Sequence, residues 1–193
     1  MTDSDVLQIF QESGALLSGH FVLTSGKHSD QYFEKFNVLN RPWHVETLCK
    51  ELAARLALSE PDVVLGPTTL GVLLAYETAK HLGIPAAYGE KGADNKRFLR
   101  RGEHITPGQR VAVVDDVLTT GGSVRECIEL VETQGATLCS VGLLVDRSGG
   151  TITFGEAPTV SLLSLQVQSF APDALPDWLA QIPITRPGST GKK

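Results

Sequence analysis

The chain has 193 residues, of which 41% are hydrophobic, so it is long enough for one domain with a sizeable core and a small appendage. Its formal net charge of −5 argues against a protein that binds nucleic acid or an anionic membrane, because such binding needs a surplus of Lys and Arg. A small anionic ligand is not excluded, since backbone N–H groups and a few cations can bind it whatever the net charge.

The three cysteines, Cys49, Cys127 and Cys139, lie far apart in apolar segments. This spacing predicts buried thiols rather than a disulfide framework or a zinc site. The N-terminus, MTDSDVLQIF, carries acids where a secretory signal would be basic, and no long apolar run follows it. We therefore expect a cytoplasmic protein.

In chain order, the hydrophobic pattern first predicts a short amphipathic helix over residues 3–17. Residues 19–36 predict two short strands around a Ser-Gly turn, and residues 44–58 predict a second helix. From residue 63 the hydrophobic pattern changes, and short apolar runs alternate with predicted helices. The predicted strands are residues 63–65, 84–88, 111–114, 138–145, 152–154 and 160–165, and the predicted helices are residues 71–82, 123–134 and 174–180.

This alternation predicts right-handed βαβ units. The expected fold is α/β, an open, mostly parallel twisted sheet flanked by helices. We expect a single domain over residues 1–193, with a core at about residues 44–165 and a small hood from about residues 1–43 and 166–193. Ligands of such sheets bind outside the carboxyl ends of the strands. The functional residues are therefore expected in the loops after Leu65, Tyr88, Val114 and Val145.

The strongest motif is VAVVDDVLTTGGS, residues 111–123, which we call the sugar-phosphate cradle. Four apolar residues predict a buried strand, and Asp115 and Asp116 follow at its carboxyl end. A short loop then leads into a helix that begins near Ser123. Gly121 and Gly122 allow consecutive N–H groups to turn toward one point, with the helix N-terminus behind them. The motif therefore predicts a site for a phosphate monoester.

The two carboxylates beside this anion site must bind something other than the phosphate. Carboxylates accept hydrogen bonds from vicinal hydroxyls or help to position a divalent cation, and they do not ligate phosphate. A phosphate next to a vicinal diol describes a ribose 5-phosphate. The alternative is an ordinary strand-to-helix turn with two solvated acids, and it is less favoured because adjacent acids at the end of a buried strand are costly without a ligand.

The cradle resembles the PRPP-binding motif of the type I phosphoribosyltransferases. The resemblance implies 5-phosphoribosyl-1-diphosphate (PRPP) as substrate, and transfer of its ribosyl group to a nitrogen base with release of diphosphate. It also implies Mg²⁺ as cofactor, held mainly by the substrate's diphosphate and ribose hydroxyls and not by a metal site of the protein. Neither a Walker loop nor a Rossmann fingerprint occurs. The residues assigned to PRPP in the cradle are Asp115, Asp116, Val117, Leu118, Thr119, Thr120, Gly121, Gly122 and Ser123.

Three segments resemble the orotate phosphoribosyltransferase family in particular, and the third is the basic segment of residues 86–108 described below. GHFVLTSGKHSDQYFEKF resembles that family's hood and base pocket, which implies contacts of Ser25, Gly26 and Lys27 with orotate. In LLVDRSGG, Arg147 follows a buried strand and offers the planar pair of donors that a carboxylate needs. The family also assigns Thr119 to orotate. Taken alone, the first segment is equally a hairpin with a polar turn. For Arg147 the alternative, a surface side chain that pairs with Asp146, is less favoured.

The segment AAYGEKGADNKRFLRRGEHITPG, residues 86–108, is basic and Gly-punctuated within an acidic protein. It fits a lid that closes over diphosphate, although a solvated charged hairpin would explain it if it stood alone. In the family this catalytic loop reaches the neighbouring subunit, which implies a homodimer with a shared lid. The cations of the segment are Lys91, Lys96, Arg97, Arg100 and Arg101. The residues expected to be catalytic are Lys91, Arg101, Asp115 and Asp116.

GPTTLG, residues 66–71, matches the position of the family's diphosphate loop, which implies a PRPP contact for Thr69. The sequence departs from the family here, because many members carry a Lys where this chain has Leu70. The lid also lacks the Lys-x-His-Gly pattern of the longer-loop members, so no general acid can be named in it.

Two other functions remain open from the sequence. A phosphoribosyltransferase for a purine or related base would share the cradle without needing Arg147. A non-catalytic PRPP-sensing regulator would explain Leu70 and the missing lid histidine, but it would usually need a basic face for DNA or RNA, which the charge balance does not provide.

Overall fold

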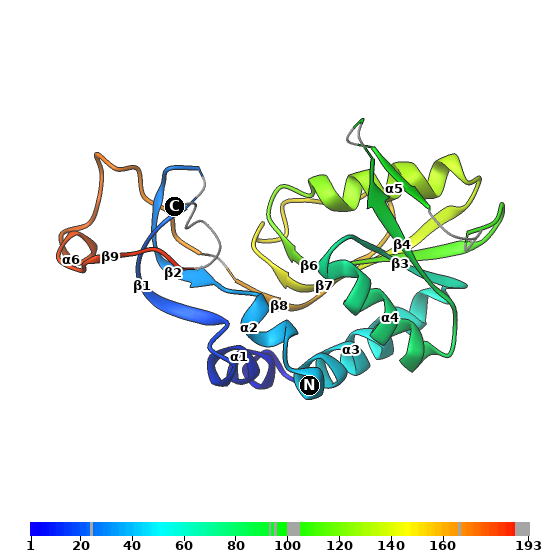
Figure 1. Ribbon diagram of the computed structural model, residues 1–193, viewed down its shortest axis with the longest axis horizontal. Coiled ribbons are helices and arrows are strands. Elements are labelled where there is room, and N and C mark those ends of the chain that lie inside the picture. The colour runs from blue at the N-terminus through cyan, green and yellow to red at the C-terminus, as the bar shows by residue number, and fades with distance from the viewer. Residues whose placement is uncertain (24, 93, 95, 100–104, 166, 188–193) are drawn as a thin grey trace. The chain divides into compact units, whose positions relative to one another are not determined.

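The computed structural model describes residues 1–23, 25–92, 94, 96–99, 105–165 and 167–187. These residues form two compact units. The larger unit comprises Trp43–Leu165 together with Met1, and the smaller comprises Thr2–Pro42 with the described residues after 166. Figure 1 labels the elements of both units.

The larger unit contains a six-stranded sheet in the order β5-β4-β3-β6-β7-β8. All neighbouring pairs are parallel except β4 with β5, which is antiparallel. The predicted α/β fold with a mostly parallel sheet is therefore confirmed. The strands are β3 (Val63–Pro67), β4 (Ala86–Lys91), β5 (Arg97–Leu99), β6 (Arg110–Leu118), β7 (Thr137–Asp146) and β8 (Thr159–Ser164).

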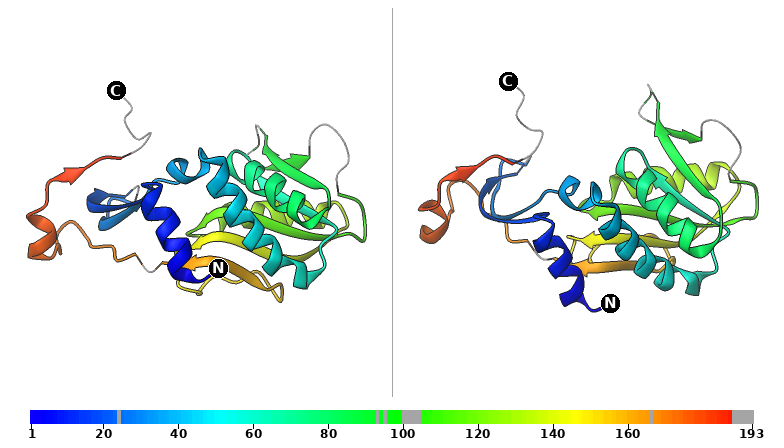
Figure 2. Two further views of the ribbon diagram at one scale, coloured as in Figure 1. Left: turned by 90° about the horizontal axis from the view of Figure 1, so that it is seen from below. Right: turned by 60° about the horizontal axis from the view of Figure 1, so that its bottom comes forward.

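Helices cover both faces of this sheet, with α5 (Gly122–Thr133) on one face and α3 (Pro42–Leu56) and α4 (Leu70–Leu82) on the other (Figures 1 and 2). The short 3-10 helix η1 (Ala57–Ser59) follows α3. On the α5 face, Val124, Cys127 and Val131 pack against buried residues of β3, β6 and β7. On the other face Gly142 of β7 lets α3 approach closely, because a Cβ there would lie 2.9 Å from Leu56 Cδ1.

The smaller unit is built around a three-stranded sheet in the order β2-β1-β9. β1 (Leu16–Val22) pairs antiparallel with β2 (His28–Phe33) and parallel with β9 (Ile184–Thr185). Three helices accompany it: α1 (Asp3–Glu12), α2 (Phe36–Leu39) and α6 (Asp177–Ala180). Phe10 of α1 packs edge-on against Phe33 of β2, with ring centroids 5.0 Å apart.

Some predicted elements differ from the structure. The helix predicted over residues 3–17 ends at Glu12, because Gly14 takes a left-handed conformation (φ +68) and Leu16 already belongs to β1. The strand predicted over residues 152–154 is only an isolated bridge between Phe154 and Ala157. The segment predicted as a lid loop contains a strand, β5, which folds back on β4.

The three cysteines are free and buried, as predicted. Burial raises the pKa of Cys49 and of Cys127 to about 12, so both thiols stay protonated at neutral pH. Among the described residues, no helix is both long and apolar enough to cross a membrane.

Candidate functional site

The two acids of the cradle lie within β6, which continues past the predicted strand end at Val114 as far as Leu118. Asp115 is 9% exposed and Asp116 is 4% exposed. The Asp116 N–H donates to Asp115 Oδ1 at 2.9 Å, and the Val117 N–H donates to Asp116 Oδ1 at 2.7 Å. Buried carboxylates need such donors to offset lost hydration, so the backbone itself fixes both groups in place.

A cavity of about 270 Å³ lies where β6 passes into α5. Gly121 caps α5 in a left-handed conformation (φ +79), and a Cβ there would lie 3.3 Å from the Phe154 ring. Glycine therefore suits this turn for both conformation and space. The lining residues are Asp115, Val117, Leu118, Thr119, Thr120, Gly121, Gly122, Ser123, Val124 and Glu126.

This cavity combines groups that suit a bound anion with a carboxylate that can accept hydrogen bonds from the hydroxyls of a ligand. The N-terminus of α5 presents N–H groups and a partial positive charge, and Thr119, Thr120 and Ser123 are exposed around it. Asp115 supplies a carboxylate to the same cavity. Asp116, the next residue of the strand, is buried as well but is not among the lining residues of this cavity.

Arg147 directly follows β7, the strand that neighbours β6. Its backbone N–H donates to the Leu118 carbonyl at 2.9 Å, which ties the start of the Arg147 loop to the cradle. The carboxylate of Asp146 accepts N–H groups from Ser148 (2.7 Å) and Gly150 (3.1 Å) and so organises that loop. The structure thus brings Arg147 and Thr119 to the same edge of the sheet, as the parallel strand order requires.

The loop between β3 and α4, residues 66–71, folds back tightly. A Cβ on Gly66 would collide with the Gly71 backbone, and a Cβ on Gly71 would lie 2.5 Å from Pro67 Cδ. The Thr68–Thr69 peptide is cis, and Thr69 is the N-cap residue of α4. Leu70, which stands where many relatives of the resembled family have Lys, is 8% exposed and contributes to the core.

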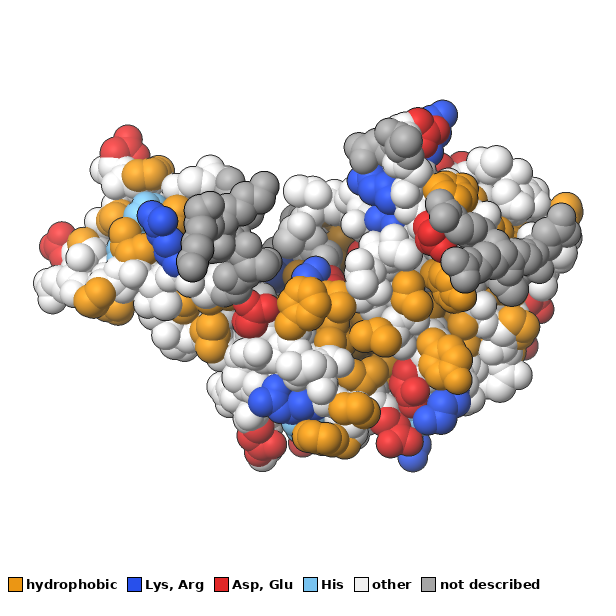
Figure 3. Space-filling view, in the orientation of Figure 1, with side chains coloured by type: hydrophobic (Ala, Val, Ile, Leu, Met, Phe, Trp, Pro, Cys, Tyr) orange, Lys and Arg blue, Asp and Glu red, His pale blue; other side chains and the backbone are white. Residues whose placement is uncertain are grey.

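The described part of the lid is the β4–β5 hairpin, along which Figure 3 shows Lys and Arg side chains. Lys91 ends β4, and its Nζ lies 3.2 Å from Glu126 Oε1 on α5. The second predicted lid residue, Arg101, lies outside the described residues. Sequence reasoning missed Glu126, although its place four residues after Gly122 could have indicated a side chain on the same side of α5 as the cradle.

The Ser-Gly turn belongs to the smaller unit, between β1 and β2. Gly26 has a left-handed conformation (φ +79), and its N–H donates to the Leu23 carbonyl at 2.9 Å. Ser25, Gly26 and Lys27 are all exposed. The turn is therefore formed by local hydrogen bonds and leaves these three residues accessible to a ligand.

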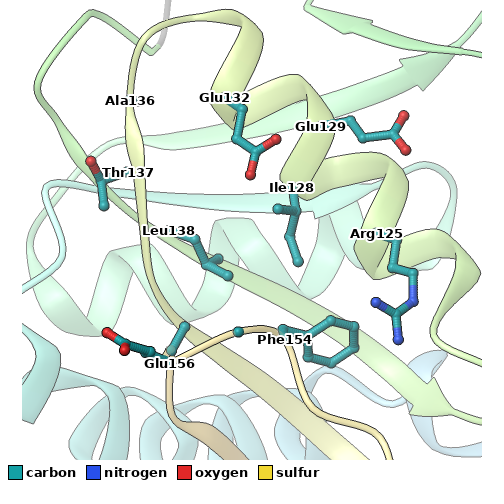
Figure 4. Close-up of a pocket in the computed structure, with 11 residues that line it drawn as sticks. Arg125, Ile128, Glu129, Glu132, Ala136, Thr137, Leu138, Phe154 and Glu156 are labelled. Carbon is teal, nitrogen blue, oxygen red and sulfur yellow. The ribbon is translucent and has the colours of Figure 1, made fainter.

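A larger cavity, of about 590 Å³, is lined by residues of α5, β7 and the bridge at Phe154 and by none of the cradle residues (Figure 4). The Arg125 guanidinium lies over the Phe154 ring, 5.2 Å from its centroid. Size alone does not make this cavity the site, because it has neither the helix N-terminus nor the buried carboxylates of the cradle.

One group of potential metal ligands occurs among the described residues, formed by Glu46, Glu77 and His81. The Lys80 ammonium lies 2.8 Å from Glu77 Oε1 and 3.7 Å from Glu46 Oε1. The ammonium group of Lys80 therefore already neutralises part of the negative charge of these two carboxylates. No comparable group of three ligands is found at the cradle within the described part of the chain.

The comparisons with known proteins agree with this geometry. The family of the phosphoribosyl transferase domain matches residues 40–154, which include the cradle. The orotate phosphoribosyltransferase of Pelotomaculum thermopropionicum is 47% identical over 189 residues, 98% of each chain. The crystal structure of the orotate phosphoribosyltransferase of Aeropyrum pernix superposes with a TM-score of 0.70 at 29% identity, covering 83% of this chain and 94% of that one.

The same fold occurs in an adenine phosphoribosyltransferase of Thermoanaerobacter pseudethanolicus, with a TM-score of 0.62 at 22% identity, covering 70% of this chain and 88% of that one. The same fold is thus found in enzymes named for different bases, and it does not identify the base. By its domain this chain belongs to the phosphoribosyltransferases, and by its full-length similarity it belongs among them to the orotate phosphoribosyltransferase family.

Proposed function

We propose that the protein transfers the 5-phosphoribosyl group of PRPP to orotate, giving orotidine 5′-phosphate and diphosphate in pyrimidine (UMP) biosynthesis. A ring nitrogen of orotate forms a bond to C1′ of the ribose while the bond from C1′ to diphosphate breaks, and the hydrogen of that nitrogen leaves as a proton to the diphosphate or to water. The observation that carries the proposal is the cradle, which joins the N-terminus of α5 to the buried carboxylate of Asp115 in one cavity.

The transfer passes through an oxocarbenium-like state with positive charge on the ribose and negative charge on the departing diphosphate. Catalysis is then mainly electrostatic. Asp115 and Asp116 accept hydrogen bonds from the ribose hydroxyls near the developing cation, and the cradle holds the 5-phosphate. Lys91 and Arg101 stabilise the diphosphate, together with Thr69 in the loop before α4. Orotate is already an anion and needs little help from a base.

Mg²⁺ is proposed as the cofactor, and the residues present fit its use. Asp115 and Asp116 offer hard oxygen donors beside the cradle, but one oxygen of each already accepts a backbone N–H. This argues for a Mg²⁺ ion held mainly by the diphosphate and hydroxyls of PRPP, with the two aspartates assisting. When bound, the ion supplies positive charge that stabilises the departing diphosphate.

Recognition of orotate is assigned to Arg147, Thr119 and the turn of Ser25, Gly26 and Lys27. Arg147 offers a planar pair of donors for the carboxylate that distinguishes orotate from neutral bases. The position of Arg147 after β7, linked to Leu118 through the backbone, supports this assignment.

A homodimer is proposed, with α4 as part of the contact surface. Leu73 and Tyr76, three residues apart on one side of α4, are 47% and 68% exposed, and Trp43 of α3 is 62% exposed. Figure 3 shows hydrophobic side chains gathered over α4. Exposed apolar patches of this kind are typical of protein interfaces.

The three free cysteines support a reducing compartment, and we propose the cytoplasm.

The experiment that tests the reaction is a spectrophotometric assay of orotate loss with purified protein, PRPP and Mg²⁺. We expect orotate to be consumed only when PRPP and Mg²⁺ are both present, and a chelator to stop the reaction. Orotate that persists under all conditions would contradict the proposed acceptor, and turnover unaffected by chelator would contradict the proposed cofactor.

A further inference from the structure

Two cations face each other across the lid hairpin. Lys91 of β4 and Arg97 of β5 are direct partners in the antiparallel register. Like charges directly opposite in a sheet repel and destabilise the pairing. A hairpin with this pair therefore needs an anion close to both side chains.

Glu126 of α5 is that anion. Its Oε1 lies 3.2 Å from Lys91 Nζ, and its Oε2 lies 2.9 Å from Arg97 Nε. One carboxylate thus bridges two cations, each through a different oxygen. Glu126 also lines the cavity of the cradle, so the ion pair with Lys91 is formed at the wall of that cavity.

The Arg97 side chain is held in place, whereas the Lys91 side chain is not; the contact of Arg97 Nε with Glu126 Oε2 is a charge contact without hydrogen-bond alignment. The Arg97 side chain is 4% exposed, and its Nη1 donates to the Gly89 carbonyl at 2.9 Å. It crosses β4 at Gly89, where a Cβ would lie 3.2 Å from Arg97 Cδ and 3.3 Å from Leu130 Cδ2. The Lys91 side chain, by contrast, is 41% exposed and can leave Glu126 without disturbing the core.

We propose that Glu126 is a positioning residue, which is anchored by Arg97 and holds the Lys91 ammonium at the wall of the cradle, ready for the phosphate groups of PRPP. The proposal rests on the proposed function in one respect, since it takes PRPP as the ligand. A carboxylate beside an anion site would repel the ligand if it stood alone. Here two cations face one carboxylate, so the group as a whole keeps a positive charge toward the cradle.

A purely structural role for Glu126 makes a different prediction. If Glu126 only relieved the repulsion between Lys91 and Arg97, Glu126→Gln would lower the melting temperature, and removing Lys91 as well would restore it. PRPP binding would then not depend on the pairing of Glu126 with Lys91. The two roles are separated by a double-mutant cycle on binding, with thermal melts of the same four proteins.

The test measures the Kd for PRPP with Mg²⁺ by calorimetry in the wild type, Glu126→Gln, Lys91→Ala and the double variant. We expect Glu126→Gln to raise Kd about tenfold and the double variant to bind no worse than Lys91→Ala alone, because Glu126 acts through Lys91. The matched control is Glu129→Gln on the same helix, since Glu129 makes no ion pair within the described part of the chain. It should bind PRPP within about twofold of the wild type.

Independent, multiplying losses in the double variant would overturn the proposal, and so would a Glu126→Gln protein that binds PRPP as tightly as the wild type or more tightly. The experiment contains no orotate, so its result does not depend on the acceptor. A wild type that binds PRPP but does not use orotate would refute the proposed acceptor and leave the role of Glu126 measurable. A wild type that does not bind PRPP would refute both.

Discussion

Asp115 and Asp116 are the two residues to which the proposed function assigns binding of the ribose. Both are buried within a strand, where a carboxylate is costly unless donors surround it, and each accepts one backbone N–H. We expect the two carboxylates to accept hydrogen bonds from the hydroxyls of a ribose. The fold therefore keeps two acids buried within one strand, which supports the proposed binding site.

Replacement of one acid by its amide tests this role. We expect Asp116→Asn to lower kcat/KM by about tenfold to a thousandfold, because an amide loses the charge that favours the developing cation. The fold should be retained, since the two side chains have nearly the same shape. Steady-state kinetics and a thermal melt measure the two effects. The control is Glu156→Gln, in the exposed turn before β8. Unchanged kinetics in Asp116→Asn would contradict a role of Asp116 in binding the ribose.

At the scale of elements, the loop before α4 depends on two glycines that touch. The loop reverses so sharply that Gly71 lies against the ring of Pro67. We expect Gly71→Ala to lower the free energy of unfolding by about 1–3 kcal/mol, because the new Cβ forces the ring or the backbone to shift. Denaturant unfolding measures it. Gly122→Ala is the contrast, because the nearest atom to its Cβ would be 3.9 Å away, and equal losses in both variants would refute the explanation.

The sequence predicted the elements of the sheet well, because each strand and helix has its own hydrophobic period. The strands β3, β4, β7 and β8 and the helices α3, α4 and α5 lie within a few residues of their predicted ranges. β6 was predicted too short, since two acids look like the end of a strand although neighbouring backbone groups can satisfy them inside it. β5 was missed because the charged run Lys96-Arg97 has no apolar alternation to signal a strand.

The candidate site was predictable where residues adjacent in sequence form it. The cradle is such a case, because one strand, one loop and one helix start contain it. Glu126 was not predictable in the same way, since its contacts with Lys91 and Arg97 join α5 to a hairpin about thirty residues earlier in the chain. Pairings of that kind depend on the sheet order, which one sequence does not reveal.

At the scale of the whole molecule, the lid residues are expected to serve different subunits of the proposed dimer. Lys91 lies against Glu126 of its own chain, so it should act on its own cradle. Arg101, in the basic run after β5, is expected to act on the cradle of the neighbouring subunit.

Mixing variants of low activity separates these roles, with recovery counted above the activity of each variant alone. Arg101→Ala mixed with Asp116→Asn should recover about a quarter of wild-type activity, because half of the random dimers are mixed and each has one complete site. Lys91→Ala mixed with Asp116→Asn should recover none. Turnover is measured after subunit exchange. Recovery in the Lys91 mixture would contradict action within one chain, and no recovery in the Arg101 mixture would contradict the shared lid.

The central claim is that the cradle and Arg147 together make a transferase for orotate. The most direct measurement is a competition, in which the protein receives PRPP and Mg²⁺ with orotate and adenine at equal concentrations, and the nucleotide products are quantified. The ratio of products equals the ratio of the two kcat/KM values, and we expect orotidine 5′-phosphate to exceed adenosine 5′-phosphate by about a hundredfold or more. A product mixture dominated by adenosine 5′-phosphate, or no nucleotide at all, would contradict the account.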